Sequence, residues 1–213
     1  MAIKTKAFIR RAERDDLDKV VEWMEDEDFL TFLYGDPARS PRQIREQIVS
    51  MLGRSGGNAA PGGIYLIIDS AEHGPLGMLS LQNISWRNRG CSIDLYIGKK
   101  HLRNHLLAAA MFYCAVEYCF DELNLHRVTA YIYSFNEPSW KILERTGAKR
   151  ELLLKNHIAR NGQFYDVYGY GLLRREFEEF RKNSPKLTDG LMETMIEEHQ
   201  KAISAAAAKE FGQ

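Results

Sequence analysis

Cysteine and histidine, the side chains with the strongest intrinsic reactivity, form no evident catalytic or metal-binding motif in this sequence. The three cysteines, Cys91, Cys114 and Cys119, are a scattered set in which no pair has metal-site spacing with histidines nearby. Cys114 and Cys119 lie in a strongly apolar stretch, where buried free thiols are common, so we interpret them as structural. His101 and His105 flank the start of an expected helix, where a protonated histidine could bind phosphate. A surface position is the simpler interpretation for both.

Composition and charge limit the class of protein. The chain has 213 residues, of which 45% are hydrophobic and 27% charged, as is typical of a globular domain with a core. Lys plus Arg and Asp plus Glu each total 29, so no broad basic surface for nucleic acid is expected. Met1–Lys6 lacks an apolar signal core, and no apolar run approaches the ~20 residues that span a bilayer. We therefore expect a cytoplasmic protein with no membrane or nucleic-acid partner.

The elements that must position a site follow from hydrophobic spacing. Two amphipathic helices are expected before a glycine-rich loop at residues 53–63, a long apolar helix at Leu106–Leu123, and a helix that Asn136 caps and that stops at Gly147. Short alternating or continuous apolar runs predict the strands, and Asn161-Gly162 predicts a hairpin turn. The expected strands are Ala7–Arg11, Ile64–Ile68, Leu76–Ile84, Cys91–Ile97, His126–Tyr133, Lys149–Asn156 and Phe164–Leu172.

The C-terminal part of the chain has a different composition. From Arg174 it becomes charged and helical, and Met192, Met195, Ile196 and Ile203 form only a thin apolar stripe. A helix with so little apolar surface is marginally stable alone, so we expect it to dock on the domain or on a partner chain, as in a homodimer. The alternative is that this stretch is disordered. We expect one domain at residues 1–176 and a helical C-terminal extension at residues 177–213.

Five strings in the same order resemble one branch of the GNAT acyltransferase superfamily, the branch that acetylates ribosomal-protein N-termini, polyamines and some antibiotics. They are Asn83–Arg89, Ile93–Gly98, Asn124–Val128, Ser134–Ala148 and Asp166–Leu173. The resemblance covers about residues 7–176. It implies an α/β (α+β) fold with a mixed, mostly antiparallel central sheet, splayed fourth and fifth strands and flanking helices.

The resemblance also implies acetyl-CoA or another acyl-CoA as co-substrate, with no metal. The pantetheine arm would enter between the splayed strands and bond to the backbone of the fourth, here Leu95, Tyr96 and Ile97. The pyrophosphate would lie on the N-terminus of the long helix, where N–H groups and the helix dipole attract anions. The corresponding residues are Arg103, Asn104, His105, Leu106, Leu107 and Ala108.

This pyrophosphate loop departs from the family pattern. Leu106 stands where the middle glycine is expected, and Asn104 replaces a frequent glycine. The leucine side chain could point into the core and leave the N–H groups available, or it could block the diphosphate. The alternatives to an ordinary acetyltransferase are therefore a non-catalytic GNAT-fold module, or an acyltransferase that uses a carrier-protein thioester.

The same resemblance suggests roles for individual residues. Asn136 matches a position that contacts the pantetheine arm, in addition to capping its helix. Ser139 matches a position near the thiol and is the candidate general acid, since Leu143 stands where many relatives have Tyr. Relatives often carry a Glu base where this chain has Ser92; Asp94 faces the same side of the strand and could replace it. The alternative for Asp94 is a solvated or salt-bridged carboxylate.

The expected reaction is transfer of an acyl group to a primary amine, from a small molecule or a peptide N-terminus, with the oxyanion held by a fourth-strand N–H. The amine would bind between the first two helices and the last hairpin. Aromatic residues could line this site, although such residues more often belong to a core. They are Trp23, Phe29, Phe32, Tyr34, Tyr165 and Tyr168.

Overall fold

The computed structural model describes residues 8–33, 40–54, 62–100 and 105–183. Several expectations fall on positions outside these ranges: the N-terminus, Tyr34, Arg103, Asn104 and the chain from residue 184 onward. The described elements follow the order that the sequence predicts. They are β1 (Phe8–Arg11), η1 (Arg14–Asp16), α1 (Leu17–Met24), α2 (Glu27–Phe32), α3 (Pro41–Arg54), β2 (Ile64–Asp69), β3 (Gly77–Ser85), β4 (Gly90–Ile97), α4 (His105–Glu117), η3 (Tyr118–Glu122), β5 (Arg127–Tyr133), α5 (Glu137–Arg145), β6 (Lys149–Arg160), β7 (Gln163–Leu173) and α6 (Arg174–Asn183).

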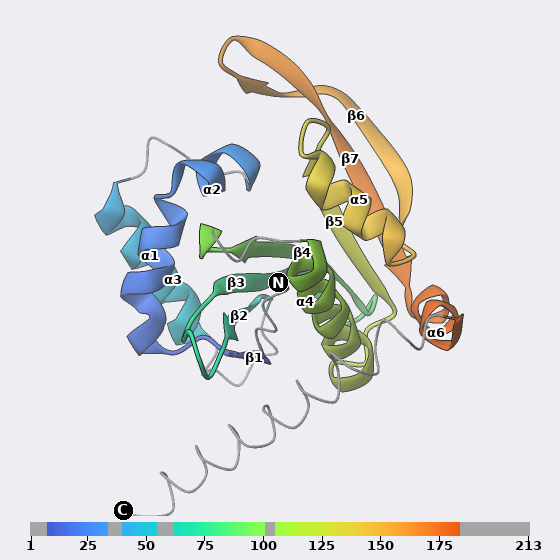
Figure 1. The fold of residues 1–213 in the computed structure, drawn as a ribbon, viewed down its shortest axis with the longest axis horizontal. Coiled ribbons are helices and arrows are strands. Elements are labelled where there is room, and N and C mark those ends of the chain that lie inside the picture. Colours follow the sequence, from blue (N-terminus) through green and yellow to red (C-terminus); the bar gives the residue numbers. More distant parts are fainter. Residues whose placement is uncertain (1–7, 34–39, 55–61, 101–104, 184–213) are drawn as a thin grey trace, which may run out of the picture.

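The seven strands form one mixed sheet in the order β1-β2-β3-β4-β5-β7-β6. Neighbouring strands are antiparallel except β4 and β5, which are parallel. The sheet confirms the expected fold class. The strands β6 and β7 extend as a long hairpin beyond the rest of the sheet (Figure 1). Their turn at Asn161 and Gly162 has the positive φ values, 51° and 75°, that this dipeptide accommodates in a two-residue hairpin.

The two faces of the sheet are covered by different helices. Leu79, Leu81 and Ile93 belong to the core cluster that contains α4, whereas Met78 and Tyr96 belong to the cluster that contains α1 and α3. Successive residues of a strand point to opposite faces, so this alternation places α4 on one face and α1 and α3 on the other (Figure 1). We call them the α4 face and the α1–α3 face.

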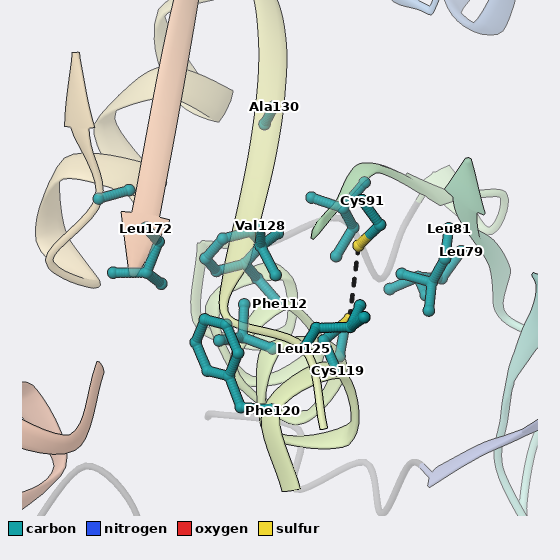
Figure 2. Close-up of a cluster of buried hydrophobic side chains, with 14 of the residues drawn as sticks. Leu79, Leu81, Cys91, Phe112, Cys119, Phe120, Leu125, Val128, Ala130 and Leu172 are labelled. Atoms are coloured by element: carbon teal, nitrogen blue, oxygen red, sulfur yellow. Dashed lines mark hydrogen bonds between the residues drawn. The ribbon is translucent and has the colours of Figure 1, made fainter. Parts of the chain in front are cut away.

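Cys91 and Cys119 lie in the largest core cluster, on the α4 face (Figure 2). Both are buried free thiols, and their sulfur atoms are 3.9 Å apart. Leucines, phenylalanines and valines surround them. Burial raises the pKa of the Cys114 thiol, which lies at the edge of the same cluster, to about 12. A thiol with such a pKa is a poor nucleophile at neutral pH.

The long apolar helix differs from the expected Leu106–Leu123 in its last turn. The α-helical part ends at Glu117, and residues 118–122 form a π-helix. The N–H of Leu123 donates to the carbonyl of Tyr118, five residues earlier, which is the wider spacing of a π turn. Asn124 then reverses the chain with a φ of 51°.

The boundary expected at residue 176 falls inside α6. Phe177 is 1% exposed and packs against Tyr113 and Phe120, with ring centroids 4.9 and 5.6 Å apart. Arg181 also pairs with Glu117 at 3.1 Å. The chain as far as Asn183 therefore packs on the domain.

The contact between α1 and the end of β4 generates the first prediction. A Cβ atom at Gly98 would overlap the indole ring of Trp23, which is 3% exposed and packed on every side. Gly98→Ala should lower the free energy of unfolding by about 1–3 kcal/mol, because overpacking forces the ring or the backbone to shift. The measurement is urea denaturation, with Gly62→Ala as control, since a Cβ there meets nothing within 4 Å. Equal stability of the two variants would contradict the expectation.

Candidate functional site

The site begins where β4 and β5 separate. Their parallel pairing covers only Gly90–Ser92 of β4 and Arg127–Thr129 of β5, and Ser92–Thr129 is the last bridge. Beyond it, β4 continues to Ile97 paired with β3, and β5 continues to Tyr133 paired with β7. The expected splay of the fourth and fifth strands is therefore present, and it opens next to Asp94.

A cleft of about 660 Å³ lies on the α1–α3 face beside this opening. It is bounded by α1, α2 and α3 on one side and by residues of β5, β6 and β7 on the other. This is the position in which the sequence analysis places the acceptor. Asp94 and Ser92 line the cleft from β4.

Asp94 is a half-buried carboxylate. Burial raises its pKa to about 6, although a hydrogen bond with Ser80 acts in the opposite direction. No ion pair involves Asp94 among the described residues, so the salt-bridged alternative is not what the structure contains. A raised pKa of this kind is typical of general bases, and also of some structural carboxylates.

Two residues of β3 hold the Asp94 side chain. Ser80 is the direct cross-strand partner of Asp94, and Gln82 lies two residues along the same face. Gln82 Nε2 donates to Asp94 Oδ2 at 2.9 Å and to Ser80 Oγ at 3.0 Å. The sequence analysis missed both residues, although they alternate with Leu79 and Leu81 and so had to face away from α4.

The three residues expected to bind pantetheine lie on β4 beyond the last bridge. Leu95 and Ile97 point their side chains to the α4 face. The Tyr96 side chain points to the other face, where its hydroxyl donates to Asp26 Oδ1 at 2.9 Å. Asp26 Oδ1 also accepts a hydrogen bond from the N–H of Asp28 at 2.9 Å, and this bond caps α2. Tyr96 therefore anchors the start of α2 to the sheet.

The pyrophosphate loop is described only in part. α4 begins at His105, and Leu107 is buried in a cluster with Ile97 and Met111, with Ala108 at its edge. The side chains of His105 and Leu106 are outside the description. The start of α4 lies on the α4 face of the sheet. An extended ligand bound there could pass through the opening toward Asp94.

Asn136 and Ser139 lie at the start of α5, and neither lines the cleft. α5 packs on the α4 face, where Leu143 is 5% exposed in the main core. The structure thus places Ser139 and Asp94 on opposite faces of the sheet. Asn136 is the N-cap residue of α5, as expected, but its side chain makes no capping hydrogen bond. Its ψ of 61° differs from the extended backbone that directs a cap side chain at the next N–H groups.

Most of the expected aromatic residues within the described ranges do not line the cleft: Trp23, Phe32, Tyr165 and Tyr168. Phe29 does, with its ring 5.0 Å from that of Tyr96. Trp23 is buried beside Gly98 instead, and the ring of Tyr165 meets that of Phe135 edge to face, with centroids 4.8 Å apart. Two residues that the sequence analysis did not select, Tyr131 and Leu152, line the cleft from the hairpin side.

Within the described ranges, no three His, Cys, Asp or Glu side chains form a group that could hold a metal ion. No helix among the described residues has the length and apolar character needed to cross a membrane.

Known proteins show the same architecture. The family described as Acetyltransferase (GNAT) domain matches residues 6–149. The chain is 25% identical over 171 residues to the uncharacterized N-acetyltransferase p20 of Bacillus licheniformis, covering 79% of this chain and 93% of that protein. It is 36% identical over 62 residues to the uncharacterized N-acetyltransferase YnaD of Bacillus subtilis (strain 168), which is 29% of this chain and 36% of that protein. Among solved structures, that of spermidine N-acetyltransferase from Vibrio cholerae in complex with CoA and spermine aligns with a TM-score of 0.73 at 19% identity, covering 81% of this chain and 98% of that one.

The split sheet, the helix that starts beside the opening and the cleft on the opposite face define an acyltransferase of the GNAT fold. The chain belongs to the GNAT acetyltransferase family, which confirms the resemblance seen in the sequence. It is an N-acyltransferase, an enzyme that transfers an acyl group to an amine.

The burial of Asp94 generates a prediction about stability. Because its pKa is raised to about 6, the folded state binds a proton that the unfolded state releases near pH ~4. The contribution of Asp94 to stability therefore falls as the pH rises from about 4 to about 6, and Asp94→Asn removes this loss. The variant should match the parent at pH 4 and be roughly 2–3 kcal/mol more stable at pH 7.

Urea denaturation at both pH values measures this difference. The control is Asp15→Asn, a change at an exposed carboxylate, which should not reproduce it. If Asp94→Asn were less stable than the parent protein at pH 7, the ionised carboxylate would stabilise the fold, and the prediction would be wrong.

A second prediction concerns Asn136. An N-cap side chain normally contributes about 1 kcal/mol, but Asn136 makes no capping bond, so Asn136→Ala should cost less than about 0.5 kcal/mol. Asp26→Ala is the comparison, because Asp26 does accept the N–H of Asp28 and the hydroxyl of Tyr96. Thermal unfolding of both variants checks the expectation, which a larger loss at Asn136 would contradict.

Proposed function

We propose that the enzyme transfers an acetyl group from acetyl-CoA to a primary amine bound in the cleft, with Asp94 as the general base. The observation that carries the proposal is the position of Asp94. It is a half-buried carboxylate with a pKa of about 6, it lines the cleft, and it lies two residues beyond the last bridge between β4 and β5. The structure of the Vibrio cholerae protein is described as a complex with CoA and spermine, an amine, which supports an amine acceptor here.

The opening between β4 and β5 would admit the pantetheine arm. Leu95, Tyr96 and Ile97 lie on β4 along this opening, and their backbone would hold the arm. Residues 103–108 and the N-terminus of α4 would hold the diphosphate through backbone N–H groups. Asn136, whose side chain does not cap α5, would contact the arm from the α4 face. Acetyl-CoA supplies the thioester carbonyl that the amine attacks.

Asp94 would take the proton of the incoming ammonium group. An alkylammonium ion has a pKa near ~10, so the amine needs a base to become nucleophilic at neutral pH. With a pKa of about 6, Asp94 is mostly ionised at pH 7 and can accept this proton directly or through water. Gln82 holds the carboxylate in position.

Ser139 would act on the other side of the opening. It lies in the first turn of α5, on the α4 face, and does not line the cleft. A base on the acceptor face would lie near the amine, and an acid on the cofactor face would lie near the sulfur of the thioester. Ser139, directly or through water, is the candidate that protonates the departing sulfur.

The pH dependence of kcat/KM tests the assignment of the base. The parent enzyme should show an acidic limb with an apparent pKa near 6, below which kcat/KM falls about tenfold per pH unit. Asp94→Asn should lose this limb and reduce kcat/KM by about 10²–10⁴-fold. Acetyl-CoA affinity, measured by calorimetry, should stay unchanged in the variant, because Asp94 faces the acceptor side. Full activity of Asp94→Asn with an unaltered pH profile would refute the assignment.

A further inference from the structure

Two large apolar side chains are exposed inside the cleft. Tyr131 and Leu152 are 40% and 42% exposed, and both line the cleft from the side of β5 and β6. Leu154 of β6 and Val167 of β7 line it beside them. Exposed apolar surface within a concave site is typical of a place where a ligand binds.

A glycine lets these side chains form one continuous surface. Gly169 of β7 is the register partner of Tyr131 on one side and of Leu152 on the other. A Cβ atom at Gly169 would lie 2.9 Å from Leu152 Cβ and 3.4 Å from Tyr131 Cε1, so both side chains lean over the glycine. We call Tyr131, Gly169 and Leu152 the apolar ledge.

The apolar ledge lies across the opening from Asp94. Ser92 and Thr129 form the last bridge between the parallel strands, and Asp94 and Tyr131 each lie two residues further on. Partners in a parallel pair point to the same face, and so do residues two apart. Asp94 and Tyr131 therefore flank the opening on the same face, and both line the cleft.

The opposite wall of the cleft is also apolar. Phe29, Leu30 and Leu33 line it from α2 and its end. The hydrogen bond from Tyr96 to Asp26 fixes the start of α2, so this wall has a defined position.

The acidic groups of the cleft provide little charge for a polycation. Asp16 already forms an ion pair with Arg10, whose guanidinium donates to both carboxylate oxygens at 2.6 and 2.7 Å. Glu13 is exposed at the edge. Asp94, which is half-buried, is the carboxylate beside the opening, and the described residues provide no ion pair for it. This arrangement suits one ammonium group beside apolar surface rather than several cations.

We propose that the acceptor is a primary amine that carries a large apolar group, aryl or branched alkyl, close to the nitrogen, and that the apolar ledge and α2 bind this group. The inference rests on the proposed function and specifies the substrate class of the same site. The same chemistry occurs in free arylalkylamines and in peptides with a large apolar first residue. A polyamine or an amino sugar would leave the apolar ledge in contact with water or with polar groups.

Steady-state acetylation of four amines tests the proposal: 2-phenylethylamine, a tripeptide with N-terminal Phe, spermidine and glucosamine. The first two should exceed the last two in kcat/KM by at least about tenfold, since pockets discriminate apolar groups by about 10–200-fold. Preference for the tripeptide over 2-phenylethylamine would identify peptides as the source, and the reverse would identify small amines. A higher kcat/KM for spermidine or glucosamine than for both apolar amines would overturn the proposal.

A pair of adjacent variants separates the apolar ledge from general effects of charge. Leu152→Glu places a carboxylate on the ledge, whereas Leu153→Glu places one on the opposite face of the same strand, at a residue that is 47% exposed and does not line the cleft. Leu152→Glu should reduce kcat/KM for 2-phenylethylamine at least about tenfold and raise it for spermidine, while Leu153→Glu should change neither. Equal effects of the two variants would overturn the proposal.

Binding without turnover keeps this test independent of the proposed reaction. Calorimetric titration of the protein with 2-phenylethylamine and with spermidine, both in the presence of CoA, measures selectivity even if no amine is acetylated. Tighter binding of 2-phenylethylamine that Leu152→Glu weakens would support the substrate class while refuting the proposed reaction. Tighter binding of spermidine would overturn the substrate class.

Discussion

The early end of the pairing between β4 and β5 is the constraint on which the site depends. Three bridges hold the two halves of the sheet together, and the last joins Ser92 to Thr129. Beyond it each strand is supported from its outer side, β4 by β3 and β5 by β7, so the opening has rigid edges. An opening between strands connects the two faces of the sheet. In the proposed reaction, cofactor and acceptor would approach from opposite faces and meet at Asp94, and strands hold such geometry better than loops do.

The environment of Asp94 links stability to chemistry. A buried ionised carboxylate destabilises the folded state, and the bonds with Ser80 and Gln82 offset only part of that cost. The same burial brings the pKa of Asp94 to about 6, close to the pH at which a general base is most effective. Replacing Asp94 by an amide would relieve the loss of stability and would also remove the group proposed as general base. A position that is unfavourable for stability and located beside an opening in the sheet is typical of a functional residue.

The cleft combines parts of the chain that are distant in sequence. α2 supplies one wall and is held against β4 by the bond between Tyr96 and Asp26. The apolar ledge supplies the other wall, and it exists because Gly169 lets the side chains on both neighbouring strands close over it. On the other face, the buried pair Cys91 and Cys119 and the aromatic contacts of Phe177 belong to a continuous core that holds α4 and α6 against the sheet. The α4 face thus carries the largest core cluster, whereas the α1–α3 face carries both a smaller core cluster and the cleft.

The sequence by itself determined the order of the elements, the hairpin at Asn161-Gly162 and the face on which Asp94 lies, because side-chain periodicity and turn chemistry are local properties. It did not predict Ser80 and Gln82 as the partners of Asp94, since the register between β3 and β4 sets which side chains meet. Nor did it predict the apolar ledge, because Tyr131 and Leu152 become neighbours only through the strand order β5-β7-β6. The sequence also did not predict that Asn136 lacks a capping bond or that a π turn follows α4, since both are features of the backbone conformation in the folded protein. Tertiary structure decided the partners of Asp94 and the apolar ledge because both depend on which distant segments come together, and sequence spacing does not encode those contacts.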